Sequence, residues 1–156
     1  MKKYKPYIIS TLIALGVGGL SALFTQGSSS FYETVNQPPL SPPSWLFPVV
    51  WSILFILMGI GSARVYEGIE ENREVKSPAL TIYGVNLVMN FLWSIIFFNI
   101  RAFLFAFIWL ILLIGVIIKM IIEFRKISLW AGNIQIPYLL WCIFALYLNF
   151  GIYVLN

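Results

Sequence analysis

Amide and aromatic side chains recur at helical spacing within residues 78–100. Asn86 and Asn90 stand four residues apart, and Trp93 and Phe97 continue the same stripe. Because residues three and four apart share one face of a helix, these four side chains point the same way. An amide in hydrocarbon needs a hydrogen-bond partner, so both should face the protein interior. Two interpretations stay open: the amides join neighbouring helices, which the spacing alone favours, or they orient a bound molecule.

A second stripe of this kind lies near the C-terminus. Tyr138, Trp141, Ala145, Leu148 and Asn149 fall on one helical face. Two large side chains followed by a small one can leave a recess at Ala145, with an indole above it and an amide below. The stripe therefore predicts one wall of a cavity.

A third aromatic pair, Trp51 and Phe55, is one helical turn apart. Tryptophans near a membrane surface usually belong to an interfacial belt, and three of the six suit that assignment: Trp45, Trp109 and Trp130. Trp51, Trp93 and Trp141 lie deeper or share a face with amides, so a belt explains them less well. Stacked indoles and phenols suit a flat, apolar, polycyclic ligand, whose polar edge a few amides could hold.

Several chemistries are excluded by absent residue types. The 156 residues include no His and no Asp, and Cys142 is the single cysteine. An intrachain disulfide, a Ser-His-Asp triad, a His-ligated haem and a thiolate or imidazole metal site are therefore ruled out. No acidic residue lies near the middle of an apolar run, which argues against a proton relay. We expect no metal and no tightly bound cofactor.

The elements that must position these residues are transmembrane helices. Hydrophobic residues make up 60% of the chain and charged residues 10%, against roughly a quarter charged in soluble domains. Five apolar runs reach the length of about 20 residues that a helix needs to span a bilayer: 6–25, 46–66, 78–100, 102–122 and 133–155. The first could be mistaken for a signal peptide, but it is too long, and no cleavage site precedes a soluble domain. The sequence predicts an all-α integral membrane protein, with residues 1–156 forming one five-helix domain.

The orientation follows from the basic residues. With the N-terminus inside, Arg101 is the one basic residue on the outer flanks, and all the others lie on the inner flanks: Lys2, Lys3, Lys5, Arg64, Arg73, Lys76, Lys119, Arg125 and Lys126. We therefore predict the N-terminus inside, the C-terminus outside and a multi-pass location in the plasma (inner) membrane. Because these basic residues lie at the ends of apolar runs, they indicate topology, and we expect no nucleic-acid partner.

The outer segment 26–45 is the one long connection. It contains four closely spaced prolines, which favour extended or turn geometry: Pro38, Pro39, Pro42 and Pro43. The segment can form a stiff lid over the outer end of the bundle or serve only as a tether.

Small residues recur at a spacing of four on the first two spans. Ala14, Gly18 and Ala22 form one such series, and Gly59 and Ala63 form another. Small residues allow helices to approach closely in lipid. The pattern predicts helix contacts, either within the chain or in a homodimer.

Three ordered blocks of sequence resemble the TspO/MBR family of tryptophan-rich sensory proteins and translocator proteins. The first block is PPLSPPSW at 38–45, followed by FPVVW at 47–51 and the pair Met58-Gly59. The second is NLVMNFLWS at 86–94 with Phe97-Phe98, and the third is PYLLW at 137–141 with Phe144-Ala145 and Leu148-Asn149. The resemblance covers essentially the whole chain.

The resemblance implies a five-helix membrane bundle, often dimeric, that binds porphyrins, sterols and benzodiazepine-type ligands. It implies a cavity near the outer end, closed by the proline-rich loop. Trp51, Asn90, Trp141, Ala145 and Leu148 match positions associated with ligand contact. Light-dependent breakdown of protoporphyrin IX has been proposed for some bacterial members, with Trp51 matching the implicated tryptophan. We therefore take Trp51 as the candidate catalytic residue and add Trp141 as a second candidate of our own.

One feature departs from the family pattern. Animal members carry a sterol-recognition motif at the end of the last helix, with a tyrosine followed by a basic residue. The matching positions here are Phe150 and Val154, and no Lys or Arg follows the fifth span. Sterol transport is therefore the family activity that this sequence supports least.

The sequence analysis leads to a hypothesis and its alternatives. The hypothesis is a membrane protein that binds tetrapyrroles such as protoporphyrin IX, as ligand or substrate, and that can promote their oxidative degradation in light. The alternative is a transporter or stress sensor for porphyrin or sterol-like ligands without catalysis. The predicted ligand contacts are these: Trp51, Phe55, Asn86, Asn90, Trp93, Tyr138, Trp141, Ala145, Leu148 and Asn149.

Overall fold

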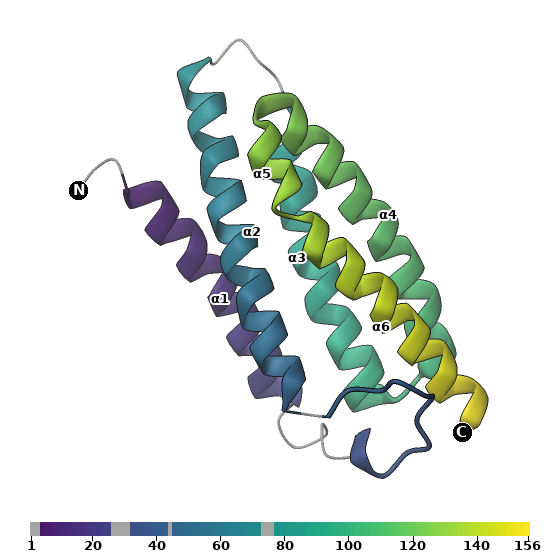
Figure 1. The fold of residues 1–156 in the computed structure, drawn as a ribbon. Coiled ribbons are helices and arrows are strands. Elements are labelled where there is room, and N and C mark those ends of the chain that lie inside the picture. Colours follow the sequence, from purple (N-terminus) through teal and green to yellow (C-terminus); the bar gives the residue numbers. More distant parts are fainter. Residues whose placement is uncertain (1–3, 26–31, 44, 73–76) are drawn as a thin grey trace.

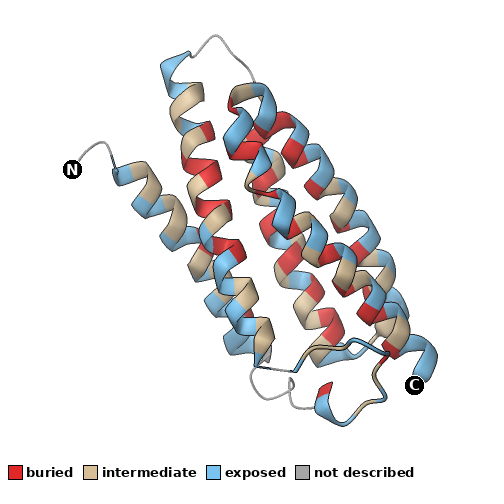
Figure 2. Ribbon diagram, viewed as in Figure 1, coloured by how far each residue is buried: buried red, intermediate tan, exposed pale blue. Residues whose placement is uncertain are grey.

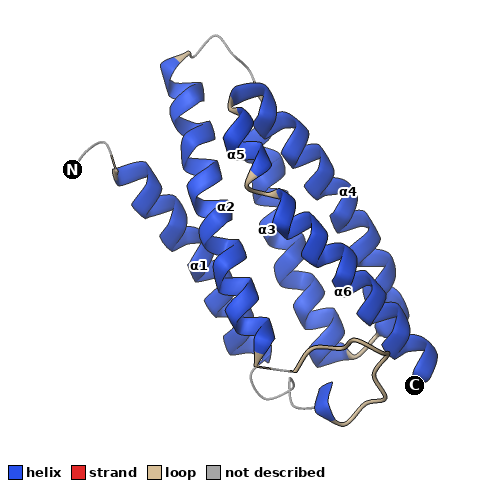
Figure 3. Ribbon diagram, in the orientation of Figure 1, coloured by secondary structure: helices blue, strands red, loops and turns tan. Residues whose placement is uncertain are grey.

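A computed structural model describes residues 4–25, 32–43, 45–72 and 77–156 as a bundle of helices (Figure 1). The elements are α1 (Lys5–Thr25), α2 (Leu46–Glu71), α3 (Ala79–Ser94), the π-helix η2 (Ile95–Ile100), α4 (Phe103–Ile127), α5 (Leu129–Asn133) and α6 (Ile136–Leu155). Within these described residues the chain is helix and loop, with no strand (Figure 3).

Five helical segments are long and apolar enough to cross a membrane, as predicted. Two helices continue beyond their predicted spans. Helix α2 ends at Glu71 rather than at residue 66, and α4 ends at Ile127 rather than at residue 122. The added turns carry charged residues, which favour helix once a helix has begun but add nothing to an apolar run.

The fifth span is interrupted, and it begins at Leu129 rather than at residue 133. The short helix α5 precedes α6, and Pro137 occupies the first turn of α6, where a missing N–H is tolerated. The side chain of Gln135, between the two helices, donates from Nε2 to the Leu57 carbonyl of α2 at 2.9 Å. This contact anchors the break in the fifth span to the second.

The third span changes geometry at its end. Helix α3 passes into the π-helix η2, which stops at Arg101, where φ is +59°. π-Helical turns are rare and occur frequently at functional sites. The Asn99 side chain of this turn donates from Nδ2 to the Phe24 carbonyl at 3.0 Å, so it ties the end of α1 to the third span.

Small residues bring α1 and α2 together within the chain. A Cβ on Gly59 would lie 2.4 Å from the Thr11 Cα, and a Cβ on Gly18 would lie 2.7 Å from the Phe55 ring. Ala14 is fully buried, whereas Ala22 is exposed. Of the two interpretations of the small residues, the contact within the chain therefore accounts for both Gly18 and Gly59.

The described part of the proline-rich segment is fastened to the end of α6. Asn156 donates from Nδ2 to the Asn36 carbonyl at 2.9 Å, and Tyr147 donates from its hydroxyl to the Pro39 carbonyl at 2.5 Å. The Pro38 ring packs directly on Gly151, where a Cβ would lie 2.5 Å from the Pro38 Cγ. The segment is therefore held in a defined place.

Tyr32 anchors the other side of this segment. Its hydroxyl donates to the Pro42 carbonyl at 2.9 Å, and its carbonyl accepts a hydrogen bond from Gln37. Burial raises the pKa of Tyr32 above its ordinary value of 10.0, so the phenol stays neutral and keeps its proton for Pro42. Between these anchors, Leu40 adopts a φ of +69°, which a branched side chain rarely does.

The outward faces of the helices are apolar and exposed, which is how a protein in a bilayer presents itself to lipid (Figure 2). The start of α1 and the C-terminus lie at opposite ends of the bundle (Figure 1). Opposite ends are what an odd number of spans requires. Which end faces inward stays a prediction from the basic residues. Four of these residues lie outside the described part of the chain: Lys2, Lys3, Arg73 and Lys76.

A candidate ligand-binding cavity

A cavity of about 480 Å³ opens between the helices at the end of the bundle that carries the 32–43 segment. Its volume falls in the range of roughly 300–1,000 Å³ that is common for small-molecule sites. Its wall is formed by the second half of α1, the first half of α2, the junction of α3 with η2, residues 141–152 of α6, and Tyr32. Trp45, predicted to belong to a membrane belt, also borders the cavity while remaining 66% exposed.

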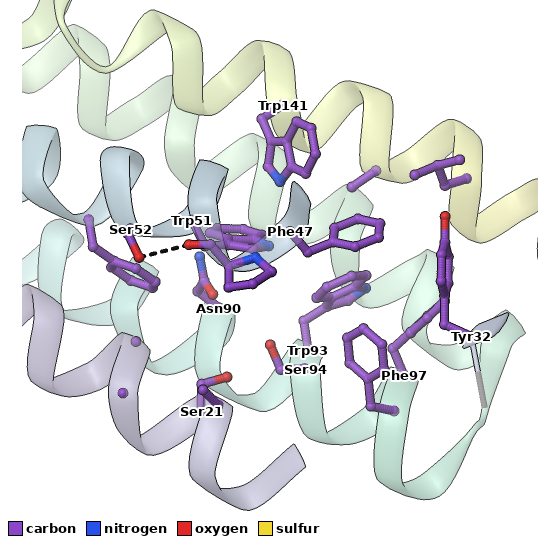
Figure 4. A pocket seen from close by; sticks show the side chains of 18 of the residues that line it. Ser21, Tyr32, Phe47, Trp51, Ser52, Asn90, Trp93, Ser94, Phe97 and Trp141 are labelled. Carbon is purple, nitrogen blue, oxygen red and sulfur yellow. Dashed lines mark hydrogen bonds between the residues drawn. The ribbon is translucent and has the colours of Figure 1, made fainter. Parts of the chain in front are cut away.

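Aromatic side chains from three spans converge on this cavity (Figure 4). The Trp51 ring lies 6.4 Å from Trp141 at 89° and 6.1 Å from Tyr138, measured between ring centroids. At the junction of α3 with η2, Trp93 stacks on Phe97 at 5.1 Å and 24°. These separations fall within the range of about 4.5–7 Å for favourable ring pairs. The rings therefore support one another and present faces and edges to the enclosed space.

Both ends of the Asn149 amide are engaged in joining helices. Its Oδ1 accepts from Trp93 Nε1 at 3.2 Å, and its Nδ2 donates to the Phe103 carbonyl at 2.9 Å. Asn149 borders the cavity, but these bonds show the helix-joining role. They hold the Trp93 ring in place against α6.

Asn90 belongs to a different set of bonds. Its Nδ2 donates to the Tyr138 hydroxyl at 2.8 Å, and this hydroxyl donates to Asn86 Oδ1 at 2.6 Å. Asn90 borders the cavity, whereas Asn86 and Tyr138 lie behind it and do not. Asn86 and Tyr138 were predicted as ligand contacts but are absent from the wall. Asn86 bonds to Tyr138 and Tyr138 bonds to Asn90, so both are linked to the cavity through Asn90.

The indole of Trp141 supplies an unused donor. Its Nε1 is buried and has no hydrogen-bond partner among the described residues. Figure 4 shows this nitrogen on the side of the ring that faces the cavity, toward Trp51. The same indole borders a shallow apolar groove on the outer surface between α2 and α6, so it separates the cavity from that groove.

The described residues that line the cavity include none with a formal charge. Ser52, whose hydroxyl could serve a ligand, donates instead to the Pro48 carbonyl at 2.7 Å (Figure 4). The polar groups left for a ligand are therefore few and neutral. The cavity suits a molecule that is mostly apolar, with any ionised group kept at the mouth.

The structure places eight of the ten predicted contact residues in the wall of this cavity: Trp51, Phe55, Asn90, Trp93, Trp141, Ala145, Leu148 and Asn149. Sequence reasoning missed the contribution of α1, where Gly18, Gly19 and Ser21 line one side. Small residues had suggested only helix packing, and nothing in their spacing distinguishes the two roles. Phe98 was also missed, because the predicted stripe followed spacings of three and four residues and so passed through Phe97 alone.

The fold and the cavity together define a multi-pass integral membrane protein with an aromatic site between its helices. Residues 9–155 match the TspO/MBR family, and the chain belongs to that family. It is 37% identical to the tryptophan-rich protein TspO of Chlorobaculum tepidum, over 92% of this chain and 91% of the relative. It is 34% identical to the protein CrtK of Rhodobacter capsulatus (89% and 85% covered) and 29% identical to the translocator protein of Ovis aries (93% and 86%).

Family membership carries a general role in ligand binding or transport in membranes. The bacterial relatives point to the plasma membrane as its location. The matched range, residues 9–155, reaches from the first turns of α1 to the end of α6.

Proposed function

We propose that the cavity binds tetrapyrroles such as protoporphyrin IX, together with other flat apolar ligands. The observation that carries this proposal is the convergence of Trp51, Trp93 and Trp141, from three different spans, on one uncharged cavity. Large π-faces attract planar rings, and a low density of polar groups penalises ligands that need many hydrogen bonds.

The polar groups in the wall suit the remainder of such a ligand. Trp141 offers an unpaired N–H, and Asn90 brings an amide to the same cavity. Carboxylates of a porphyrin would be costly inside a wall whose described residues are uncharged, so they belong at its edge beside Trp45, which is 66% exposed. No metal ligand is required for this mode of binding.

The direct test is a titration of the purified protein in nanodiscs with metal-free protoporphyrin IX in the dark. Wild type is compared with Trp51→Phe and with Trp130→Phe, whose indole lies on α5 outside the cavity. We expect saturable binding in wild type and in Trp130→Phe, and affinity lower by several-fold in Trp51→Phe. Binding that does not saturate above the level of empty nanodiscs would refute the proposal.

A second candidate function is oxidative degradation of the bound porphyrin in light, with dioxygen as the oxidant. Trp51 favours it, because its ring borders the cavity 6.4 Å from the ring of Trp141, so two oxidisable indoles adjoin the ligand space. The excited porphyrin would supply the photochemistry, and the protein would contribute orientation and an oxidisable indole.

Illumination of the same samples separates this function from simple bleaching. One defined product, formed over repeated turnovers and lost in Trp51→Phe but not in Trp130→Phe, would establish an enzyme. A mixture of products that is the same in all three proteins would leave a binding protein whose tryptophans are damaged as bystanders. Ligand transport without chemistry would give saturable binding and no product.

A further inference from the structure

A chain of four buried side chains leads from α2 to the cavity. Met58 Sδ lies 3.8 Å from Asn86 Nδ2, Asn86 Oδ1 lies 2.6 Å from the Tyr138 hydroxyl, and that hydroxyl lies 2.8 Å from Asn90 Nδ2. Each of the four is at most 2% exposed. Only Asn90, at the end of the chain, borders the cavity.

The chemistry of its first member sets the direction of this chain. A thioether sulfur can accept a hydrogen bond but cannot donate one, so Met58 favours the amide NH₂ of Asn86. The Asn86 carbonyl oxygen then faces Tyr138, whose single hydroxyl proton it accepts. With that proton committed, the Tyr138 oxygen can only accept from Asn90, and it does so from Nδ2.

The amide of Asn90 is thereby held with its nitrogen toward Tyr138. None of the described residues donates to Asn90 Oδ1, so this carbonyl oxygen is open to a donor on a ligand, while one N–H of the amide is engaged by Tyr138. If the donor and acceptor roles along these hydrogen bonds were reversed, the Asn90 side chain would offer its NH₂ to a ligand instead. An asparagine alone cannot discriminate donors from acceptors, because its two ends have nearly the same shape.

We infer that Tyr138, Asn86 and Met58 are positioning residues that make Asn90 a hydrogen-bond acceptor, and so select planar ligands that carry an N–H donor. The inference rests on the proposed binding function and adds a substrate class to it. Trp141, with its unpaired N–H, supplies the complementary preference for an acceptor elsewhere on the ligand. The site is thus chemically polarised although it carries no charge.

Three tricyclic probes of nearly identical outline test this inference. Carbazole has a ring N–H, dibenzofuran has a ring oxygen, and fluorene has a CH₂ at the same position. Dissociation constants are measured by titration calorimetry with the protein in nanodiscs, and the signal of empty nanodiscs is subtracted. We expect wild type to bind carbazole about fivefold more tightly than fluorene, the gain that one neutral hydrogen bond provides.

Variants of the hydrogen-bonded residues should change the ratio of carbazole affinity to fluorene affinity without changing the affinity for fluorene. Tyr138→Phe keeps the ring beside Trp51 but removes the hydroxyl, so the preference for carbazole should fall to less than twofold. Met58→Leu removes the sulfur and keeps the volume, so it should reduce the preference partly. The matched control is Tyr83→Phe, because Tyr83 is a buried tyrosine of α3 that packs on Phe124 away from the cavity.

Equal affinity of wild type for carbazole and fluorene would overturn the inference, as would a preference that survives in both Tyr138→Phe and Met58→Leu. Failure of all three probes to bind would also overturn it. The Met58→Leu result decides if Tyr138→Phe does not fold. Carbazole selectivity without saturable protoporphyrin IX binding would refute the tetrapyrrole proposal alone, and porphyrin binding without selectivity would refute this inference alone.

Discussion

The two ends of the helical bundle are built from the same spans but packed in opposite ways. At the end that carries the 32–43 segment, large rings such as Trp51 and Trp93 stand between the spans and enclose a cavity. At the other end glycines bring helices into contact: a Cβ on Gly61 would lie 2.3 Å from Gln135 Nε2, and a Cβ on Gly132 would lie 2.9 Å from the Ile121 carbonyl oxygen.

Charge follows the same division. Glu123 is buried near the end of α4 and is paired with Lys126 at 3.0 Å and with Lys119 at 3.5 Å. The described lining of the cavity has no charged side chain. The comparison shows that one bundle can be closed by small residues and ion pairs at one end while rings hold it open at the other. The predictions below test that division.

The largest effect is expected where α1 and α2 touch. Gly59→Val should lower the free energy of unfolding by about 3 kcal/mol, because its side chain would overlap the Thr11 backbone, which cannot move without separating the helices. Thermal unfolding in detergent measures the change. Gly16→Val is the control, since a Cβ at Gly16 meets nothing within 4 Å, and it should be near neutral. Equal losses in both would show that the helix contact contributes little.

Filling the cavity should abolish binding while leaving the closed end intact. Ala145→Phe places a ring in the recess of α6 and should weaken protoporphyrin IX binding at least tenfold, or about 1.4 kcal/mol. Ile143→Phe adds a ring on the exposed face of the same helix and should bind as wild type does. Unchanged affinity in Ala145→Phe would place the ligand elsewhere.

Loosening the 32–43 segment should have a smaller effect. Tyr147→Phe removes the hydrogen bond to the Pro39 carbonyl, which is worth about 1 kcal/mol. We expect several-fold faster amide hydrogen exchange at residues 36–41, measured by mass spectrometry, with little change in the helices. Tyr153→Phe, on an exposed face of α6, is the control. Exchange that is unaltered by Tyr147→Phe would mean that the contacts of Asn36 and Pro38 hold the segment by themselves.

The smallest effect is expected at Leu40, whose φ of +69° is strained for a branched residue. Leu40→Gly should stabilise the protein by less than about 1 kcal/mol, because relief of strain is partly offset by the greater freedom of glycine in the unfolded chain. Leu40→Ala keeps the strain and removes the exposed side chain, so it should be neutral. A lower stability of Leu40→Gly in the same unfolding assay would show that the positive φ at Leu40 does not cost the protein stability.

Much of the candidate site could be predicted from helical spacing. Asn90, Trp93, Trp141 and Ala145 share faces of two apolar runs, and the structure brings both faces to one cavity. Spacing could not show that Tyr138 lies behind the wall rather than in it. That position depends on how α3 and α6 approach each other, and no local pattern records the approach.

The ends of the elements show the same limit. The apolar run ends near residue 66, but α2 continues to Glu71, because backbone hydrogen bonding continues beyond the membrane-compatible residues. The change to π-helix at Ile95 likewise has no signature in hydropathy, although it falls in the segment whose Phe97 and Phe98 line the cavity.

By itself the sequence determined that this protein lies in a membrane, how many times its helices can cross, and which chemistries its missing residue types exclude. These depend on composition and on run length, which are local. The tertiary structure alone decided which rings enclose a common space, which amides are consumed in joining helices, and which way the Asn90 amide faces. These depend on contacts between residues far apart in the sequence, such as Met58 with Asn86 (28 positions) and Trp93 with Asn149 (56 positions), and only packing brings such pairs together.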